Sequence, residues 1–405
     1  MLRYALTIFL SAFLLFQVQP LIGKYILPWF GGTPSVWTTC MLFFQVLLLG
    51  GYAYAHLIAS RLSTRNQTIL HLGLLAVSVG FLWQFPPDAS WKPADSQSPS
   101  LRILLLLGAT IGAPYLVLSS TGPLLQQWFH RTNPGRSPYR LYALSNVGSL
   151  LALLTYPFLV EPSLKLGTQA TIWSIGYICF AVLCGWCAIK LLRATDKATA
   201  SATAASGAPV VEPVMSDEVG VPRLRKPSWV DVTMWMALAA AGSAMLLATT
   251  NQMSQEVAVV PFLWILPLAL YLLTFIICFD SPMWYLRSLF IVALAASTSF
   301  TYNVLVEGAG AELWKQVVAF SATMFVSCMV CHGELYKSRP HPRYLTLFYL
   351  CISAGGAIGG LLVAIVAPNV FPGYWEYHIV LPAICALALL SFSRDPNWIL
   401  YRGRP

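Results

Sequence analysis

Long apolar runs separated by short polar segments make up most of this chain of 405 residues. A helix needs roughly 20 apolar residues to cross a bilayer once, so the pattern predicts about twelve transmembrane helices. The expected fold class is an all-α polytopic membrane protein. The predicted spans are 4–23, 36–59, 67–85, 101–128, 140–160, 168–192, 229–252, 259–280, 284–304, 313–335, 344–367 and 376–393.

Composition excludes a soluble protein of this length. Apolar residues make up 57% of the chain and charged residues 10%, whereas about a quarter of the residues in soluble domains are charged. The net charge of +9 does not indicate a nucleic-acid partner, because the basic residues gather in alternate loops. With the N-terminus inside, 19 of the 24 Lys and Arg residues fall on the cytoplasmic side. The positive-inside rule therefore predicts that both termini are cytoplasmic.

One long segment divides the spans into two groups of six. Residues 194–228 are rich in Ala, Thr, Ser, Pro and Val and show no helical periodicity. Such a composition cannot bury a core, so a flexible cytoplasmic linker is expected. The predicted organisation is a six-helix half at 1–193, the linker at 194–228, a six-helix half at 229–395 and a cytoplasmic tail at 396–405.

The two halves show a weak internal repeat. An offset of 207 residues brings a basic loop and the small-residue helix after it into register in both halves. This register and the central linker favour two parallel six-helix repeats, the arrangement of major-facilitator-type transporters. The aligned pairs are Arg136 with Arg343, Tyr142 with Tyr349 and Gly148 with Gly355.

Polar side chains near the ends of the first and seventh spans are the candidate binding site. Amide and charged groups are tolerated in spans only where partners or a water-filled cavity satisfy them. Prolines nearby, including Pro20 and Pro267, are expected to interrupt the helices and free backbone groups for a ligand. The alternative is a pair of unrelated interfacial hairpins. The candidate substrate-binding residues are Gln17, Gln19, Lys24, Asn146, Asn251, Gln252 and Glu256.

Specific roles follow from the chemistry of these side chains. Glu256 is the expected charge-bearing contact, and Lys24 is its expected ion-pair partner, because a buried charge needs a counter-charge. The amides would orient the ligand. Asn146, deep in the fifth span, is expected either to bond a neighbouring helix or to contact the ligand.

Small residues interrupt two further spans. The segment 112–123, GAPYLVLSSTGP, predicts a kinked fourth span that either lines a cavity or packs tightly. The segment 353–360, SAGGAIGG, has the glycines of a nucleotide loop, but no predicted strand precedes it. Close packing of two helices is the expected role of these glycines.

The sequence contains few motifs that indicate a cofactor or a catalytic site. Cys328, Cys331 and His332 match the pattern of c-type haem attachment, but they lie within an apolar span. Buried thiols of this kind usually act as small hydrophobes, so no metal or cofactor is predicted. The sequence contains no Walker loop, no HExxH and no G-x-S-x-G motif. Nothing in the chain predicts an enzyme.

Three long segments, 11–57, 141–162 and 251–280, resemble the membrane region of bacterial fused major-facilitator/spermidine synthase-like proteins. The resemblance implies a multi-pass protein of the bacterial inner membrane, sometimes joined to a soluble aminopropyltransferase-like domain. No segment of this sequence resembles that soluble domain, so its enzymatic activity is not expected here.

Three hypotheses of function remain open. The first is a transporter-like module that binds or moves a small solute through the lipid bilayer, with an amine or polyamine as the candidate. The second is a membrane scaffold that anchors a soluble aminopropyltransferase-like partner through its basic loops and linker. An intramembrane redox protein that uses Cys328, Cys331 and His332 is a third, weaker reading.

Overall fold

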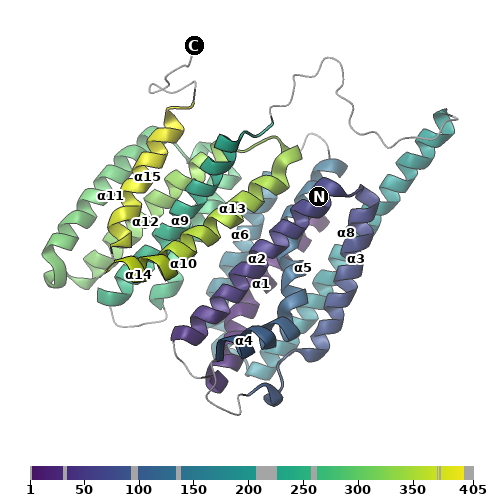
Figure 1. The fold of residues 1–405 in the computed structure, drawn as a ribbon, viewed down its shortest axis with the longest axis horizontal. Coiled ribbons are helices and arrows are strands. Elements are labelled where there is room, and N and C mark those ends of the chain that lie inside the picture. Colours follow the sequence, from purple (N-terminus) through teal and green to yellow (C-terminus); the bar gives the residue numbers. More distant parts are fainter. Residues whose placement is uncertain are drawn as a thin grey trace. The chain divides into compact units, whose positions relative to one another are not determined.

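The structure is a computed structural model, and it describes residues 2–30, 34–92, 99–133, 138–206, 226–256, 262–371, 373 and 375–395. These residues are helical almost throughout, and no β-strand occurs among them (Figure 1). The chain divides into two compact units. Unit 1 comprises Met1–Leu141, Tyr156–Pro227 and His341–Thr346, and unit 2 comprises Tyr142–Thr155, Ser228–Pro340 and Leu347–Pro405.

Unit 1 is built mainly from the helices of the N-terminal part of the chain. Its α-helices are α1 (Leu2–Phe30), α2 (Pro34–Arg61), α3 (Thr64–Gly80), α4 (Pro99–Leu107), α5 (Ala113–Thr132), α7 (Glu161–Ser163) and α8 (Leu166–Ser206). Its short 3-10 and π-helical segments are η1 (Phe81–Gln84), η2 (Ala89–Trp91), η3 (Gly108–Gly112), η4 (Tyr156–Val160) and η7 (Pro342–Tyr344). Helix α1 packs against α5 and α8, and α2 packs along α5.

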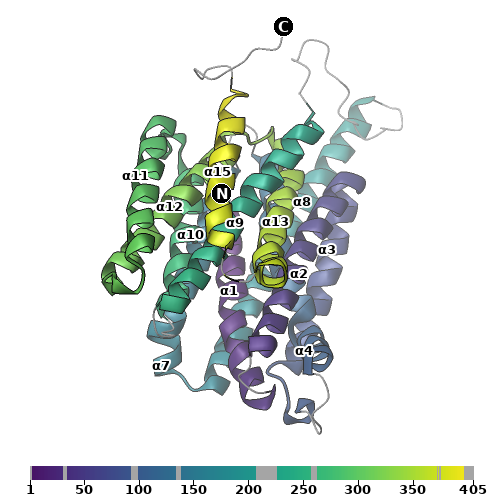
Figure 2. The same cartoon turned by 60° about the vertical axis from the view of Figure 1, so that its left-hand side comes forward.

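Unit 2 contains most of α6 (Tyr139–Thr155) and of α13 (Leu345–Leu361). Its other elements are α9 (Trp229–Glu256), α10 (Phe262–Asp280), η5 (Pro282–Trp284), α11 (Arg287–Glu307), η6 (Gly308–Gly310), α12 (Leu313–Lys337), η8 (Leu362–Val366), α14 (Ala367–Val370) and α15 (Glu376–Phe392). Helix α12 packs against α9, α10 and α11, and α15 packs along α9 (Figure 2).

Each of the predicted spans coincides with a helix. In the part of the chain described, ten helices are long and apolar enough to cross a membrane. The shorter apolar helices Ile265–Asp280 and Glu376–Phe392 correspond to the eighth and twelfth predicted spans. Length and apolar character, both properties of the sequence, were therefore sufficient to place the spans. The prediction of an all-α polytopic membrane protein is confirmed.

The expected linker at 194–228 differs from the structure over its first part. Helix α8 has 41 residues and continues to Ser206, well beyond the predicted boundary. Its final turns project past the neighbouring helices of unit 1 (Figure 1). Alanine has the highest helix propensity of all residues, and the segment 194–206 is rich in it, so the helix continues into this region. The rest of the expected linker, residues 207–225, and the tail from 396 onward lie outside the described residues.

The compact units do not follow the two sequence halves. Helix α6 precedes the linker, yet most of it belongs to unit 2. Its Tyr142 ring stacks on Tyr349 at a centroid distance of 4.6 Å and contacts Phe279 at 4.8 Å. Aromatic pairs of this kind add to the stabilisation gained by burial. The boundary expected at residue 229 therefore separates the halves in sequence, but it does not separate the packed units.

Two helices share an unusual sequence of segments at a fixed offset. Helix α6 is followed by the π-helical η4 and a short α-turn, and α13 is followed by the π-helical η8 and a short α-turn. Pro162 and Pro368 occupy matching places in the two turns, and every boundary at which these helices begin differs by 206 residues. This offset differs by one residue from the 207 expected from sequence. The shared π-segments support an internal repeat.

Glycines allow the close crossing of α13 and α9, as the sequence predicted for 353–360. A Cβ on Gly355 would lie 2.3 Å from the carbonyl oxygen of Met236, and one on Gly359 would lie 2.2 Å from that of Ala240. These distances leave no room for a side chain, so α13 can approach α9 only through glycine. The predicted role of this segment in helix packing is confirmed.

Candidate functional site

In unit 1, the amide of Gln19 meets a buried tyrosine on another helix. Gln19 Nε2 donates a hydrogen bond to the Tyr115 hydroxyl at 3.2 Å and lies 3.4 Å from the Leu15 carbonyl oxygen. Tyr115 on α5 is fully buried, whereas Gln17 and Gln19 on α1 are half-buried. Helix α1 runs without interruption through Pro20 and Pro28 to Phe30, so these prolines do not break the helix as expected. The polar contact here is made by side chains.

Lys24 is paired with a carboxylate other than the one expected from the sequence. Its ammonium forms an ion pair with Glu161 of α7 and lies 6.0 Å from the ring centroid of Tyr156. Both charged side chains are more than a third exposed. The expected partner, Glu256, lies at the end of α9, and its side chain is outside the described residues. The carboxylate that the structure gives to Lys24 is therefore Glu161.

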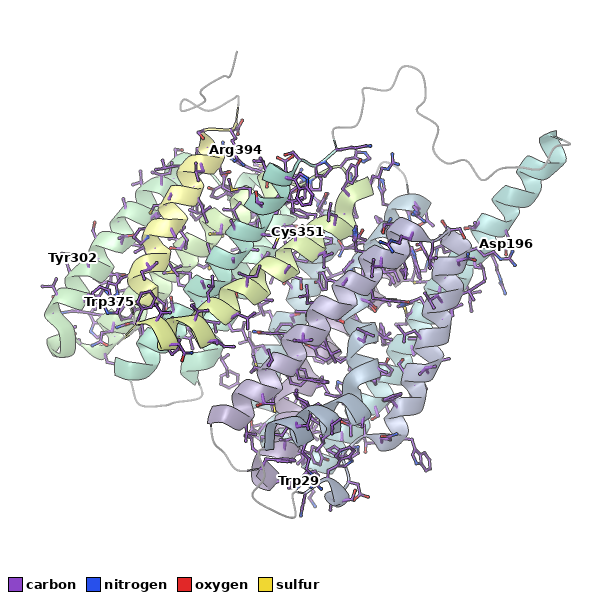
Figure 3. All side chains as sticks on the ribbon, viewed as in Figure 1. Trp29, Asp196, Tyr302, Cys351, Trp375 and Arg394 are labelled. Carbon is purple, nitrogen blue, oxygen red and sulfur yellow. The ribbon has the colours of Figure 1, made fainter. Side chains whose placement is uncertain are left out.

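In unit 2, Asn251 bonds a buried carboxylate. Its Nδ2 donates a hydrogen bond of 3.1 Å to Oε1 of Glu376, the first residue of α15. Glu376 is 6% exposed and follows Trp375, which Figure 3 labels. Gln252, the next residue on α9, is buried as well. This corner of α9 and α15 brings together a carboxylate and amide groups in a buried setting.

Asn146 has a local role in the structure. It is buried, and its Nδ2 donates a hydrogen bond of 2.9 Å to the Tyr142 carbonyl oxygen one turn earlier in α6. This bond stays within the helix, whereas the sequence favoured a bond across to a neighbouring helix or to a ligand. Of the candidate residues, Gln17, Gln19 and Lys24 lie in unit 1, and Asn146, Asn251 and Gln252 lie in unit 2.

Sequence reasoning missed the acidic partners. Glu161 and Glu376 lie at the ends of predicted spans, where acidic residues are common and attract no notice. Glu161 precedes Pro162, and Glu376 lies between Trp375 and Tyr377. Proline and interfacial aromatic residues are both common at the ends of membrane helices. These neighbours place the two residues at helix ends, but no local pattern identifies the side chain that each one meets.

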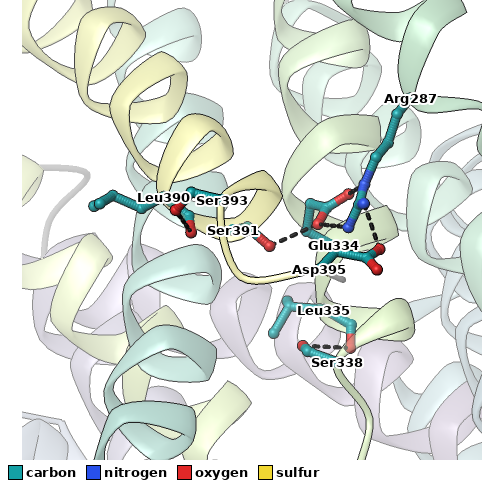
Figure 4. Close-up of polar contacts among 8 residues, drawn as sticks. All are labelled: Arg287, Glu334, Leu335, Ser338, Leu390, Ser391, Ser393 and Asp395. Atoms are coloured by element: carbon teal, nitrogen blue, oxygen red, sulfur yellow. Dashed lines mark hydrogen bonds and ion pairs between the residues drawn. The ribbon is translucent and has the colours of Figure 1, made fainter. Parts of the chain in front are cut away.

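A larger ionic network in unit 2 was also missed. Arg287, at the start of α11, bonds Glu334 of α12 through two nitrogens and bonds Asp395 at 2.5 Å (Figure 4). The Ser391 hydroxyl donates a further bond of 2.6 Å to Glu334. The nearby Tyr285 is buried, and this burial raises the pKa of its phenol. The network joins the ends of three helices.

The Cys328–His332 segment is part of the packed interior of unit 2. His332 Nδ1 lies 2.8 Å from the Thr274 hydroxyl, and its ring stacks on Phe275 at 3.6 Å. Cys328 and Cys331 belong to a cluster of buried apolar residues. Among the described residues, no group of three or more His, Cys, Asp and Glu side chains is arranged to hold a metal ion. The contacts observed for this segment are those of a packed core.

No protein-family model matches the sequence, and no curated protein matches it. Solved structures do match over nearly the whole chain. The proton:xylose symporter XylE aligns with a TM-score of 0.59 at 13% identity, covering 98% of this chain and 96% of XylE. A variant of the E. coli fucose:proton symporter FucP aligns with a TM-score of 0.51 at 14% identity, covering 98% of this chain and 99% of FucP.

A third match is a variant of the peptide transporter POT in complex with sulfate, with a TM-score of 0.54, 16% identity and coverage of 97% of this chain and 94% of POT. The chain has the fold of major facilitator superfamily transporters. At these identities the likeness concerns the fold alone, because one fold can serve many functions. A major-facilitator fold crosses the bilayer many times, which agrees with the ten described helices that are long and apolar enough to span a membrane.

Proposed function

We propose that this protein is a secondary transporter that moves a small solute across the membrane. The fold matches two sugar symporters and a peptide transporter along nearly their full lengths. One fold can serve many functions, so the choice of solute depends on the side chains of the site. Polar and ionisable side chains inside a membrane protein are costly and usually belong to ligand or ion pathways.

The buried carboxylate of Glu376 favours a positively charged substrate. It is 6% exposed and receives a hydrogen bond from Asn251, and no Lys, Arg or His forms an ion pair with it in the part of the chain described. The start of α15 offers some compensation, since helix N-termini favour negative charge. A buried carboxylate in such a setting is suited to accept a cation from a ligand.

We therefore infer that the solute is a small amine, with Glu376 as the contact for its ammonium group. Asn251 and Gln252 would orient the ligand, and the predicted role of Glu256 remains a second carboxylate at the same end of α9. A polyamine would need several such contacts. The monoamine and diamine classes therefore fit the site better than longer polyamines.

Uptake into proteoliposomes tests this proposal. Radiolabelled putrescine, a monoamine and a neutral sugar are offered with and without a proton gradient. We expect amine accumulation by the unaltered protein and a roughly tenfold loss for Glu376→Gln, equivalent to about 1.4 kcal/mol of ligand interaction. Glu307→Gln, which removes an exposed carboxylate on α11, is the matched control and should transport normally. Accumulation of the sugar alone, or full amine uptake by Glu376→Gln, would refute the proposed substrate class.

The scaffold hypothesis has one structural feature in its favour. Helix α8 continues past the end of its apolar span at Asp196 to Ser206, which extends unit 1 beyond its neighbouring helices. Such an extension could contact a soluble partner, including an aminopropyltransferase-like protein. Co-purification of a soluble protein that is lost when residues 197–206 are deleted, with amine uptake absent in both proteins, would favour the scaffold over the transporter.

A further inference from the structure

In unit 1 the first turns of α1 pack against the part of α8 that carries Lys190 and Arg193. The Thr7 hydroxyl donates a 2.8 Å hydrogen bond to the Arg3 carbonyl oxygen and lies 3.8 Å from the Cys187 sulfur on α8. Lys190 follows Cys187 by three residues, so it lies one turn further along the same side of α8. Arg3 lies one turn before Thr7 on α1 and Lys190 one turn after Cys187 on α8, so the Thr7–Cys187 contact sets these two cations near each other. Arg193 is one further turn along α8.

The balance of charge around these three residues is positive. None of them forms an ion pair with a carboxylate in the described part of the chain. The Nε of Arg3 is buried, and no hydrogen-bond acceptor meets it among the described residues. A buried donor that is left without an acceptor is unfavourable, and more so when the group is charged. The site therefore has unused capacity to bind an anion.

A row of exposed apolar side chains on α8 lies next to Lys190. On α8, the exposed side chains Val182, Trp186 and Ile189 are spaced by four and three residues, so they share one face of the helix. Lys190 Nζ lies 5.0 Å from the ring centroid of Trp186. On α1, the neighbouring Leu2 and Leu6 are exposed as well. In a membrane-spanning helix, exposed apolar side chains of this kind contact lipid acyl chains.

The position along α8 agrees with a membrane interface. The apolar span of this helix ends at Asp196, the acidic side chain labelled in Figure 3, and the helix continues beyond it. Trp186 lies one turn before Lys190, the first charged residue of α8, and tryptophan side chains are enriched where a span meets the lipid headgroups. Basic pockets between transmembrane helices at this level bind anionic headgroups.

We propose that Arg3, Lys190 and Arg193 form a binding site for the phosphate of an anionic phospholipid, whose acyl chain lies along Trp186 and Ile189. The adjacent apolar stripe distinguishes a lipid from a free phosphate ion, because an inorganic anion would gain nothing from it. Arg3 supplies the unsatisfied buried donor, and Lys190 is held in place by its contact with the Trp186 ring. The site does not depend on the transported solute.

Native mass spectrometry of the full chain tests the site. The protein is purified in detergent, stripped of lipid and titrated with phosphatidylglycerol or phosphatidylcholine. We expect selective binding of phosphatidylglycerol and a roughly tenfold weaker affinity for Arg3→Gln/Lys190→Gln, because each basic residue near a headgroup contributes a several-fold effect. Arg3→Lys/Lys190→Arg keeps both charges and should retain most of the affinity.

The matched control is Arg61→Gln/Arg65→Gln, which removes two exposed charges at the end of α2 and the start of α3. It should bind phosphatidylglycerol normally. An equal loss in both double variants would show diffuse surface charge in place of a site. Complete competition by millimolar inorganic phosphate would show a free-anion site, and equal binding of phosphatidylcholine would show no headgroup selectivity. Each of these three outcomes would overturn the proposal.

Fluorescence gives an independent readout in nanodiscs. Phosphatidylglycerol with brominated acyl chains should quench part of the tryptophan emission, and because other tryptophans are exposed too, the share of Trp186 is taken as the difference between the unaltered protein and Trp186→Phe. In Arg3→Gln/Lys190→Gln the quenching at low fractions of phosphatidylglycerol should fall to the level seen with brominated phosphatidylcholine. Unchanged quenching in the double variant would contradict the proposed headgroup contacts.

Discussion

The guanidinium of Arg287 donates two parallel hydrogen bonds of 2.7 Å to the two carboxylate oxygens of Glu334. Both side chains are almost fully buried. Paired bonds of this geometry are the strongest that charged side chains make. Asp395 and Ser391 complete the network, so that α11, α12 and the end of α15 are joined at one point (Figure 4).

Breaking this pair should destabilise unit 2 strongly. Removal of one partner of a buried ion pair leaves an uncompensated charge, which typically costs about 3–5 kcal/mol. We expect Glu334→Gln to lower the thermal unfolding temperature in detergent by far more than Glu307→Gln, which changes an exposed carboxylate. Asp395→Asn should have an intermediate effect, because Asp395 is 29% exposed. Equal unfolding temperatures for Glu334→Gln and Glu307→Gln would show that the network contributes little.

Neighbouring glycines on α13 should respond in opposite ways to the same change. A Cβ on Gly355 meets the Met236 carbonyl oxygen, whereas a Cβ on Gly356 meets no atom of the described residues within 4 Å. Gly355→Ala should destabilise the protein by roughly 1–3 kcal/mol through overpacking. Gly356→Ala should be neutral or stabilising by up to about 1 kcal/mol, because alanine favours the helix. Thermal unfolding of both variants measures the contrast, and similar unfolding temperatures would contradict the close crossing.

The ion pair of Lys24 with Glu161 should matter little for stability. Both side chains are more than a third exposed, and pairs of that kind contribute about 0–1 kcal/mol. A double-mutant cycle of Lys24→Met and Glu161→Gln should therefore give a small coupling free energy of unfolding. A coupling above about 2 kcal/mol would show that the pair is sequestered from solvent. A large loss of uptake in either variant with unchanged stability would favour a role in transport.

The buried imidazole of His332 has the Thr274 hydroxyl as its hydrogen-bond partner. Its Nδ1 lies 2.8 Å from the Thr274 hydroxyl, and both side chains are fully buried. Thr274→Val keeps the shape of the side chain but removes the hydroxyl, which should cost about 1–3 kcal/mol. Thr301→Val, which removes the hydroxyl that bonds Thr323 and the Ala319 carbonyl oxygen, is a matched buried control. It should be destabilised as well, but only Thr274→Val should alter the NMR shifts of the His332 ring.

The fold class, the spans and the glycine-mediated crossing of α13 could all be predicted from the sequence alone. A membrane span is recognised from the mean hydropathy of about 20 consecutive residues, so no knowledge of distant residues is needed. The crossing at Gly355 could be predicted because a close approach between membrane helices requires small residues, and these are visible in the sequence. The expected sidedness of the termini rests on loop charge alone and stays a prediction.

The partners of the polar side chains could not be predicted and depend on how the helices pack. Lys24 bonds Glu161, Asn251 bonds Glu376 and Arg287 bonds Glu334, and in each pair the partners are 47 to 137 residues apart. The tertiary structure also shows that α6 packs in unit 2 and that α1 continues through Pro20. The physical reason is that hydropathy and propensity are local quantities, whereas the partner of a buried polar group is set by the packing of whole helices against one another.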